Sequence, residues 1–152
     1  MPLSSKPGRP EFRSLPRGRL AAARAIPASL LMVIRIRMYL TLSSLTRLRK
    51  RLLPAAEPHD IGDLVAVGRV AWSVRIVSRF VPFASCLTQA QACQVLLARR
   101  GIASTLCLGV GGQGGRHMRA HAWLMCDGKV VIGGESEDLR QFRPLTELGS
   151  AR

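Results

Sequence analysis

The order of the predicted elements indicates an α+β fold, in which helices come first and a small antiparallel sheet follows, and three observations predict this order. Apolar residues recur at three- and four-residue steps through the stretch 28–78. A segment of high helix propensity then runs from Cys86 to a terminating Gly101. Beyond it, short apolar runs are separated by glycine-rich or Asp-Gly turns. We expect the sheet to pack on the helix that begins at Cys86.

The chain divides into a basic N-terminal segment and one folded domain. Its 152 residues match the usual size of a single domain. Residues 1–27 combine prolines, glycines and arginines without any periodicity, which predicts a flexible segment. We therefore place the folded domain at residues 28–152.

The formal net charge of +14 is concentrated in the first third of the chain. Residues 1–53 hold twelve Lys and Arg against one acid, Glu11, whereas residues 54–152 hold eleven against eight acids. Such asymmetry favours an anionic contact for the N-terminal part, or simply keeps a mobile segment in solution. The 5% aromatic content supplies few platforms for base stacking, so we expect no nucleic-acid partner.

The pattern of residues 28–53 predicts one long helix. Apolar residues recur along one face, basic residues fill the last turns, and Pro54 ends the helix. Arg35 and Arg37 interrupt the apolar run well before the roughly 20 residues that a bilayer requires. Because no export signal is evident, we expect a cytoplasmic protein with free thiols and no transmembrane segment.

Two further helices are predicted before the sheet. Asp60 is a suitable N-cap for a helix that reaches about Ser78. The next helix has Ser85 as its N-cap, Cys86 in its first turn and Gly101 as its C′ residue.

Three strands are predicted at residues 102–110, 120–126 and 129–132. Asp127-Gly128, between the last two strands, is a strong signal for a two-residue hairpin. The glycine-rich stretch between the first two strands predicts a mobile loop. Beyond Gly134 we expect an irregular chain, with Phe142 and Leu145 folding back onto the body.

Cys86 and His121 form the candidate catalytic pair. A thiol attacks as its thiolate, and the free N–H groups and dipole at the first turn of a helix stabilise that anion. Cys86 has this position in the predicted helix. An imidazole at the start of the following strand, His121, takes the thiol proton and returns it to the leaving amine if the strand packs beside the helix N-terminus.

The other cysteines fit structural roles. Cys93 lies in mid-helix, Cys107 in mid-strand and Cys126 at a strand end, where a cysteine is most often a small buried hydrophobe. His59 borders a helix cap and His117 lies in the glycine-rich loop, so neither is favoured as a base. With no Cys-x-x-Cys pair and no zinc-ligand spacing, we expect neither a metal nor a cofactor.

The stretches around the candidate pair carry a family resemblance. The first runs Ser85-Cys-Leu-Thr-Gln-Ala-Gln-Ala-Cys-Gln-Val-Leu-Leu-Ala-Arg-Arg-Gly-Ile102, followed by Leu108-Gly-Val110, and the second runs Ala120-His-Ala-Trp-Leu-Met-Cys-Asp-Gly-Lys-Val-Val-Ile-Gly-Gly134. With the helices before them, the likeness covers roughly residues 30–146. The chain resembles the transglutaminase-like leader peptidases of lasso-peptide biosynthesis.

The resemblance implies a papain/transglutaminase-like core and a cysteine peptidase that removes the leader from a ribosomally made precursor peptide. A separate ATP-dependent lasso cyclase then closes a macrolactam on the freed N-terminus. In this family a small domain delivers the leader, and this chain has no room for it, so we expect a separate leader-recognition protein as partner. The alternatives are a transglutaminase-type acyl transferase and a basic non-catalytic scaffold or nucleic-acid-binding protein.

The third catalytic group is less determined. Family members carry a Cys-His-Asp set, but Asp127 lies in the predicted turn, six residues or about 20 Å along the strand from His121 at ~3.3 Å per residue. A two-residue turn pairs residue 121 with 134, so Glu135 faces His121 only with a bulge or an extra turn residue. We favour Glu135 over Asp127, and a dyad oriented by a backbone group or a water is the other alternative. The N–H of Cys86 is the expected oxyanion donor.

Overall fold

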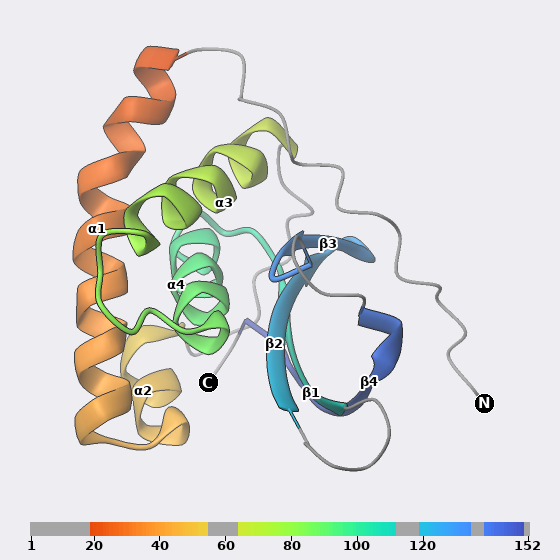
Figure 1. Cartoon of the computed structure of the whole chain (residues 1–152). Helices are drawn as coiled ribbons and strands as arrows, with labels where there is room; N and C mark the ends of the chain where they lie inside the picture. The colour runs from red at the N-terminus through yellow and green to blue at the C-terminus, as the bar shows by residue number, and fades with distance from the viewer. Residues whose placement is uncertain (1–18, 55–63, 112–118, 135–138, 151–152) are drawn as a thin grey trace.

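The computed structural model describes residues 19–54, 64–111, 119–134 and 139–150. Four helices form one layer, and a four-stranded antiparallel sheet lies against it, which confirms the predicted α+β class (Figure 1). Helix α4 is in contact with α1, α3 and three of the strands, so it occupies the centre of the fold.

The stretch predicted as one helix forms two. Helix α1 spans Arg19–Leu42 and α2 spans Leu45–Leu52. Ser44 interrupts the helix because its backbone is extended, at φ −79° and ψ 155°, and its side chain accepts a hydrogen bond from the Arg47 N–H. α1 also begins at Arg19, nine residues before the expected start, because the alanines that precede Pro27 favour helix. The prediction of a single helix over residues 28–53 was therefore wrong in its starting residue and in having no break at Ser44.

Helix α1 is long and apolar enough to cross a membrane by length and composition alone, the only such helix in the described part of the chain. The stretch Ala23–Leu42 has a mean hydropathy of 1.5. Met32, Val33 and Ile36 on one face are buried in the core, and α1 packs on α3 and α4. Its other face is exposed at five large apolar positions, Leu30, Leu31, Ile34, Met38 and Leu42.

The next two helices follow the predictions closely. α3 spans Leu64–Ser78, and the predicted cap at Asp60 lies outside the described residues. α4 spans Cys86–Ala98, with Ser85 as its N-cap. At its end the Ile102 N–H donates to the Leu97 carbonyl at 3.1 Å and the Gly101 N–H to the Ala98 carbonyl at 3.0 Å. With Gly101 at φ +74°, this is the glycine-terminated helix end that the sequence predicted.

The sheet has the strand order β3-β2-β1-β4. The three strands that were predicted are β1 at Thr105–Gly111, β2 at Arg119–Cys126 and β3 at Lys129–Ile132. Asp127 and Gly128, at φ 49° and 70°, join β2 to β3 in the two-residue turn expected for this dipeptide.

The fourth strand was not predicted. β4 spans Phe142–Leu148 after a short 3-10 turn at Leu139–Gln141, so the expectation of an irregular chain beyond Gly134 was wrong here. The prediction missed this strand because it contains Pro144, and proline cannot donate a hydrogen bond to a neighbouring strand. The sheet tolerates it because β4 is an edge strand, and because the register shift opposite Leu108 and Gly109 leaves Leu145 unpaired and exposed.

Two apolar clusters lie on opposite faces of the sheet. The main core, on the helical side, includes Ala122 and Leu124 of β2. The outer cluster, on the other face, consists of Cys107, Trp123, Val130 and Phe142 with Met125 and Leu139 packed against it. β2 therefore has both faces covered along most of its length.

A buried polar network joins α2, α4 and the C-terminal end of the described chain. Arg49 Nη1 donates to Gln94 Oε1 at 2.8 Å, and Arg49 Nη2 donates to the Gly149 carbonyl at 2.6 Å. Gln94 Nε2 donates to the Leu148 carbonyl at 2.9 Å. Gln94 is fully buried and Arg49 nearly so. The network fixes α4 between α2 and the end of β4.

Candidate active site

Cys86 is the first residue of α4. The Ser85 side chain accepts from the Thr88 N–H at 3.4 Å, and the Ser85 carbonyl accepts from the Gln89 N–H at 3.0 Å. The N–H groups of Cys86 and Leu87 precede the first N–H that these caps satisfy, so they remain available to a ligand. The Cys86 thiol is free and half-buried. A half-buried thiol beside unpaired N–H groups is the arrangement that a cysteine nucleophile requires.

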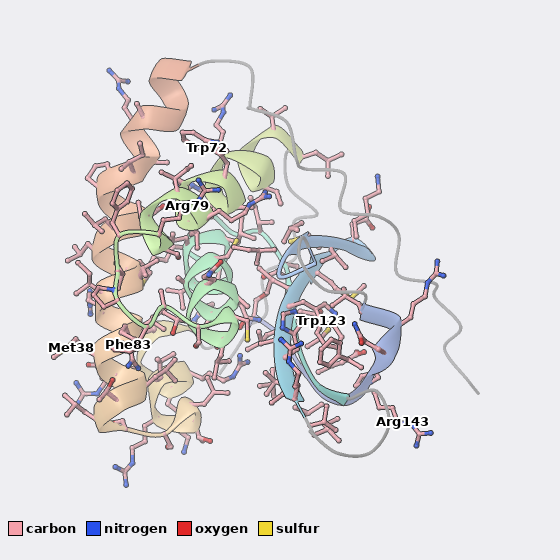
Figure 2. All side chains as sticks on the ribbon, in the orientation of Figure 1. Met38, Trp72, Arg79, Phe83, Trp123 and Arg143 are labelled. Carbon is pink, nitrogen blue, oxygen red and sulfur yellow. The ribbon has the colours of Figure 1, made fainter. Side chains whose placement is uncertain are left out.

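The chain approaches Cys86 through a strained residue. Phe83 has φ +59°, which a non-glycine residue rarely adopts. Its ring is 83% exposed and lies beside α1, with Arg37 Cζ 5.7 Å from the ring centroid (Figure 2). Strain of this kind clusters at functional sites, and here it sits three residues before the candidate nucleophile.

His121, the third residue of β2, is oriented by a backbone carbonyl. Its Nε2 lies 2.5 Å from the Gly133 carbonyl oxygen. A carbonyl only accepts hydrogen bonds, so Nε2 must carry the hydrogen. In the neutral ring Nδ1 is then the free acceptor, and Nδ1 is the atom available to act as a base.

Two aromatic rings hold the His121 imidazole on the outer face of the sheet. Its centroid lies 6.2 Å from that of Trp123, in a stacked arrangement, and 5.1 Å from that of Phe142. Gly109 pairs with His121 across the β1–β2 ladder. A Cβ on Gly109 would stand 2.9 Å from Cη2 of Trp123, so glycine is what lets the indole lie there.

The structure places Cys86 and His121 at the same end of the fold but not in contact. α4 and β2 pack together and both begin at the lower end in Figure 1. Cys86 packs against the main core, whereas His121 shares the outer face with Trp123, which Figure 2 shows on the side of β2 away from the helices. Among the described residues, no hydrogen bond joins the thiol to the imidazole.

The bulge that an acid at Glu135 requires is present. Cys126 pairs with Lys129 and Met125 with Val130, but Leu124 pairs with Ile132, so the register shifts by one residue. The side chain of Glu135 itself lies outside the described residues. Asp127 occupies the hairpin turn, and the hydrogen bond of His121 goes to Gly133 instead.

The remaining cysteines are buried, as predicted for small hydrophobes. Cys93 is fully buried in α4. Burial, with a smaller contribution from Glu147, raises the pKa of the Cys107 thiol to about 11. Burial, assisted by Asp127, raises the pKa of the Cys126 thiol to about 12. Both groups are therefore neutral thiols near pH 7 and poor nucleophiles.

Several features of this site did not follow from the sequence. The backbone orienter Gly133 was anticipated only as a general possibility, although Gly133-Gly134 after a strand is a signal for a close backbone approach. The Gln89 amide, one turn after Cys86, donates to the Ala84 carbonyl at 3.4 Å. His59, His117 and most of the glycine-rich loop lie outside the described residues.

Comparison with known proteins gives a family. No curated protein matches the chain, and no solved structure matches it. A family model described as the transglutaminase-like superfamily, which includes cysteine peptidases and transglutaminases, matches residues 30–147. The match covers α1 from residue 30 onward, the other three helices in full and the sheet up to residue 147. Both candidate residues, Cys86 and His121, lie within it. The chain belongs to the transglutaminase-like superfamily.

Proposed function

We propose that the chain is a cysteine peptidase that removes the leader from a lasso-peptide precursor. The observations that support this most are a Ser85-capped Cys86 at the start of α4 and, at the same end of the fold, a His121 whose Nδ1 is left as an acceptor. The matching stretches around both residues support the substrate class through their resemblance to lasso leader peptidases. A separate leader-recognition protein and an ATP-dependent lasso cyclase are the proposed partners.

The proposed reaction has two halves. His121 Nδ1 takes the proton of Cys86, and the thiolate attacks the carbonyl carbon of the scissile bond, forming a C–S bond. The N–H groups at the start of α4 stabilise the oxyanion. The C–N bond then breaks, and the proton on His121 passes to the leaving amine. A water repeats the sequence on the thioester, releasing the leader carboxylate and the thiol.

The two side chains must come together before the reaction starts. Cys86 packs against the main core and His121 lies on the outer face of the sheet, so the imidazole must leave its aromatic contacts before Nδ1 can reach the thiol. The aromatic contacts of His121 and the strained approach at Phe83 are the two features that a bound peptide would rearrange. We therefore expect substrate, delivered by the recognition protein, to complete the pair.

A second candidate function uses the same residues. In a transglutaminase-type transfer an amine, instead of water, attacks the thioester. The superfamily includes both activities. The two reactions differ in product mass, since acyl transfer retains the amine and hydrolysis adds one water.

The decisive experiment is mass spectrometry of the precursor peptide after incubation with the full chain and the recognition protein. Wild type and Cys93→Ala, a matched change on the same helix, are expected to cut at one site, whereas Cys86→Ala leaves the peptide intact. A product that contains an added amine identifies acyl transfer. Equal cleavage by Cys86→Ala would overturn the assignment of Cys86 as the nucleophile. If neither the wild type nor any variant cleaves the peptide while the partner is bound, a non-catalytic scaffold is favoured.

A further inference from the structure

A pocket on the outer face of the sheet plays no part in the proposed bond cleavage. It has a volume of about 500 Å³ and lies between the sheet and the turn that precedes β4. Trp123 and Phe142, whose rings contact His121, also line it. The pocket therefore adjoins the candidate base through two shared aromatic walls.

The charge of this pocket is opposite to that of the rest of the described chain. The described residues contain seventeen Lys and Arg but only two acids, Asp127 and Glu147, and both acids line the pocket. Both are exposed, and no described residue forms an ion pair with either. One guanidinium, Arg140, also lines the pocket, which leaves two carboxylates to one cation.

The two carboxylates line a pocket whose other walls are largely apolar. Cys107, Trp123 and Phe142 are each less than a tenth exposed. The Glu147 carboxylate raises the pKa of Cys107, second to burial, so its field reaches the interior of the pocket. Aromatic walls with carboxylates above them suit an alkyl chain that ends in a cation, because rings attract cations and carboxylates pair with them.

We infer that the pocket is a subsite for a basic side chain of the peptide substrate, an inference that rests on the proposed peptidase function. Its position fits a substrate residue a few positions along the peptide from the one that contacts His121. Glu147 pairs with Cys107, which pairs with Trp123, two residues beyond His121. The Cα atoms of Glu147 and His121 are then about 12 Å apart, or about four residues of extended peptide.

Arginine suits the subsite better than lysine. A guanidinium is planar and stacks on aromatic faces, whereas an ammonium is a compact and strongly hydrated charge. Asp127 lies at the β2–β3 turn and Glu147 on β4, so each carboxylate attracts the cation from its own side of the pocket without both binding it directly.

The test measures binding separately from cleavage. The probes are the capped pentapeptide acetyl-Gly-Gly-Arg-Gly-Gly-amide and its analogue with citrulline, which keeps the shape and removes the charge. They are titrated into full-length Cys86→Ala protein while the indole N–H of Trp123 is followed by NMR. We expect the arginine peptide to shift this signal and to bind about tenfold more tightly than the citrulline peptide.

Variants then locate the selectivity. Glu147→Gln and Asp127→Asn should each reduce the preference for arginine about threefold, as expected for exposed ion pairs, and the double variant should abolish it. Thr146→Lys is the matched control, because it makes the same change in net charge as Glu147→Gln at an exposed position that does not line the pocket. It should leave the preference unchanged.

The outcomes separate the two proposals. Equal binding of both peptides, no shift of Trp123, or a preference that survives in the double variant overturns the subsite, even if Cys86-dependent cleavage is found. An arginine preference that needs both carboxylates, in a protein that does not cleave the precursor, supports the cation site and overturns the peptidase function.

Discussion

His121 Nε2 donates a hydrogen bond to the Gly133 carbonyl at 2.5 Å, so a backbone carbonyl orients the imidazole. Gly133 has φ +91°, and a Cβ there would stand 2.6 Å from the Ala122 carbonyl oxygen. The carbonyl that orients the candidate base is therefore held by a backbone arrangement that favours glycine.

Gly133→Ala should damage both stability and activity. We expect an unfolding free energy lower by about 3 kcal/mol, because the strain of positive φ adds to the backbone clash, and a kcat reduced about 10- to 100-fold by misplacement of the imidazole. Gly128→Ala is the control, since Gly128 also has positive φ but nothing lies within 4 Å of its added Cβ. Gly128→Ala should lower the unfolding free energy by about 1 to 2 kcal/mol and leave the activity unchanged. Nitrogen-15 NMR of wild type tests the orienter without any variant, and a neutral His121 with its hydrogen on Nδ1 would contradict it.

The sequence predicted those parts of the fold that local chemistry determines. The Ser85 cap, the Gly101 helix end and the Asp127-Gly128 turn each depend on the conformational preference of one or two residues, and all three are confirmed. Such preferences act over a few residues and can be read directly.

The features that were missed depend on residues far apart in the chain. Pro144 argues against a strand until the sheet supplies an edge position, and the break at Ser44 becomes favourable only because α2 turns to bury Leu48 and Arg49. Arg49 was assigned to a basic cluster at a helix end, yet it is buried against Gln94 and Gly149. In the site, the position of Cys86 followed from the helix, whereas the contact of His121 with Gly133 depends on the bulge in β3.

The thiol chemistry should be selective for Cys86. Raised pKa values favour the neutral thiol, so Cys107 and Cys126 form thiolate in quantity only as the pH approaches their pKa values of about 11 and about 12. At pH 8 fewer than about one molecule in a hundred has either group ionised. Brief treatment of the folded protein with iodoacetamide between pH 7 and 9, followed by peptide mass mapping, should label Cys86 first. Equal labelling of Cys107 at pH 8 would contradict the described burial, and unfolding in urea should make all four cysteines reactive.

The buried network around Arg49 should contribute strongly to stability. Arg49→Met removes the charged donors to Gln94 and to the Gly149 carbonyl, which leaves each acceptor one neutral donor, Gln91 Nε2 at 3.3 Å and Gln94 Nε2 at 3.0 Å. We expect the unfolding free energy in urea to fall by about 2 to 4 kcal/mol. Arg51→Met makes the same change at an exposed position of the same helix and should cost less than about 0.5 kcal/mol. Similar urea midpoints for the two variants would show that the network is energetically unimportant.

The cap of α4 should affect catalysis as well as stability. Ser85→Ala removes the acceptor for the Thr88 N–H and frees the first turn on which Cys86 lies. We expect a loss of about 1 kcal/mol in unfolding free energy, together with a lower kcat, because the thiolate and the oxyanion donors both depend on that turn. Ser44→Ala removes the equivalent cap from α2, which carries no candidate catalytic residue, and should show the stability loss alone. Ser85→Thr, which retains a capping hydroxyl, should restore both quantities. If both cap deletions lowered kcat equally, the effect would be one of general stability, and the start of α4 would have no special part in the chemistry.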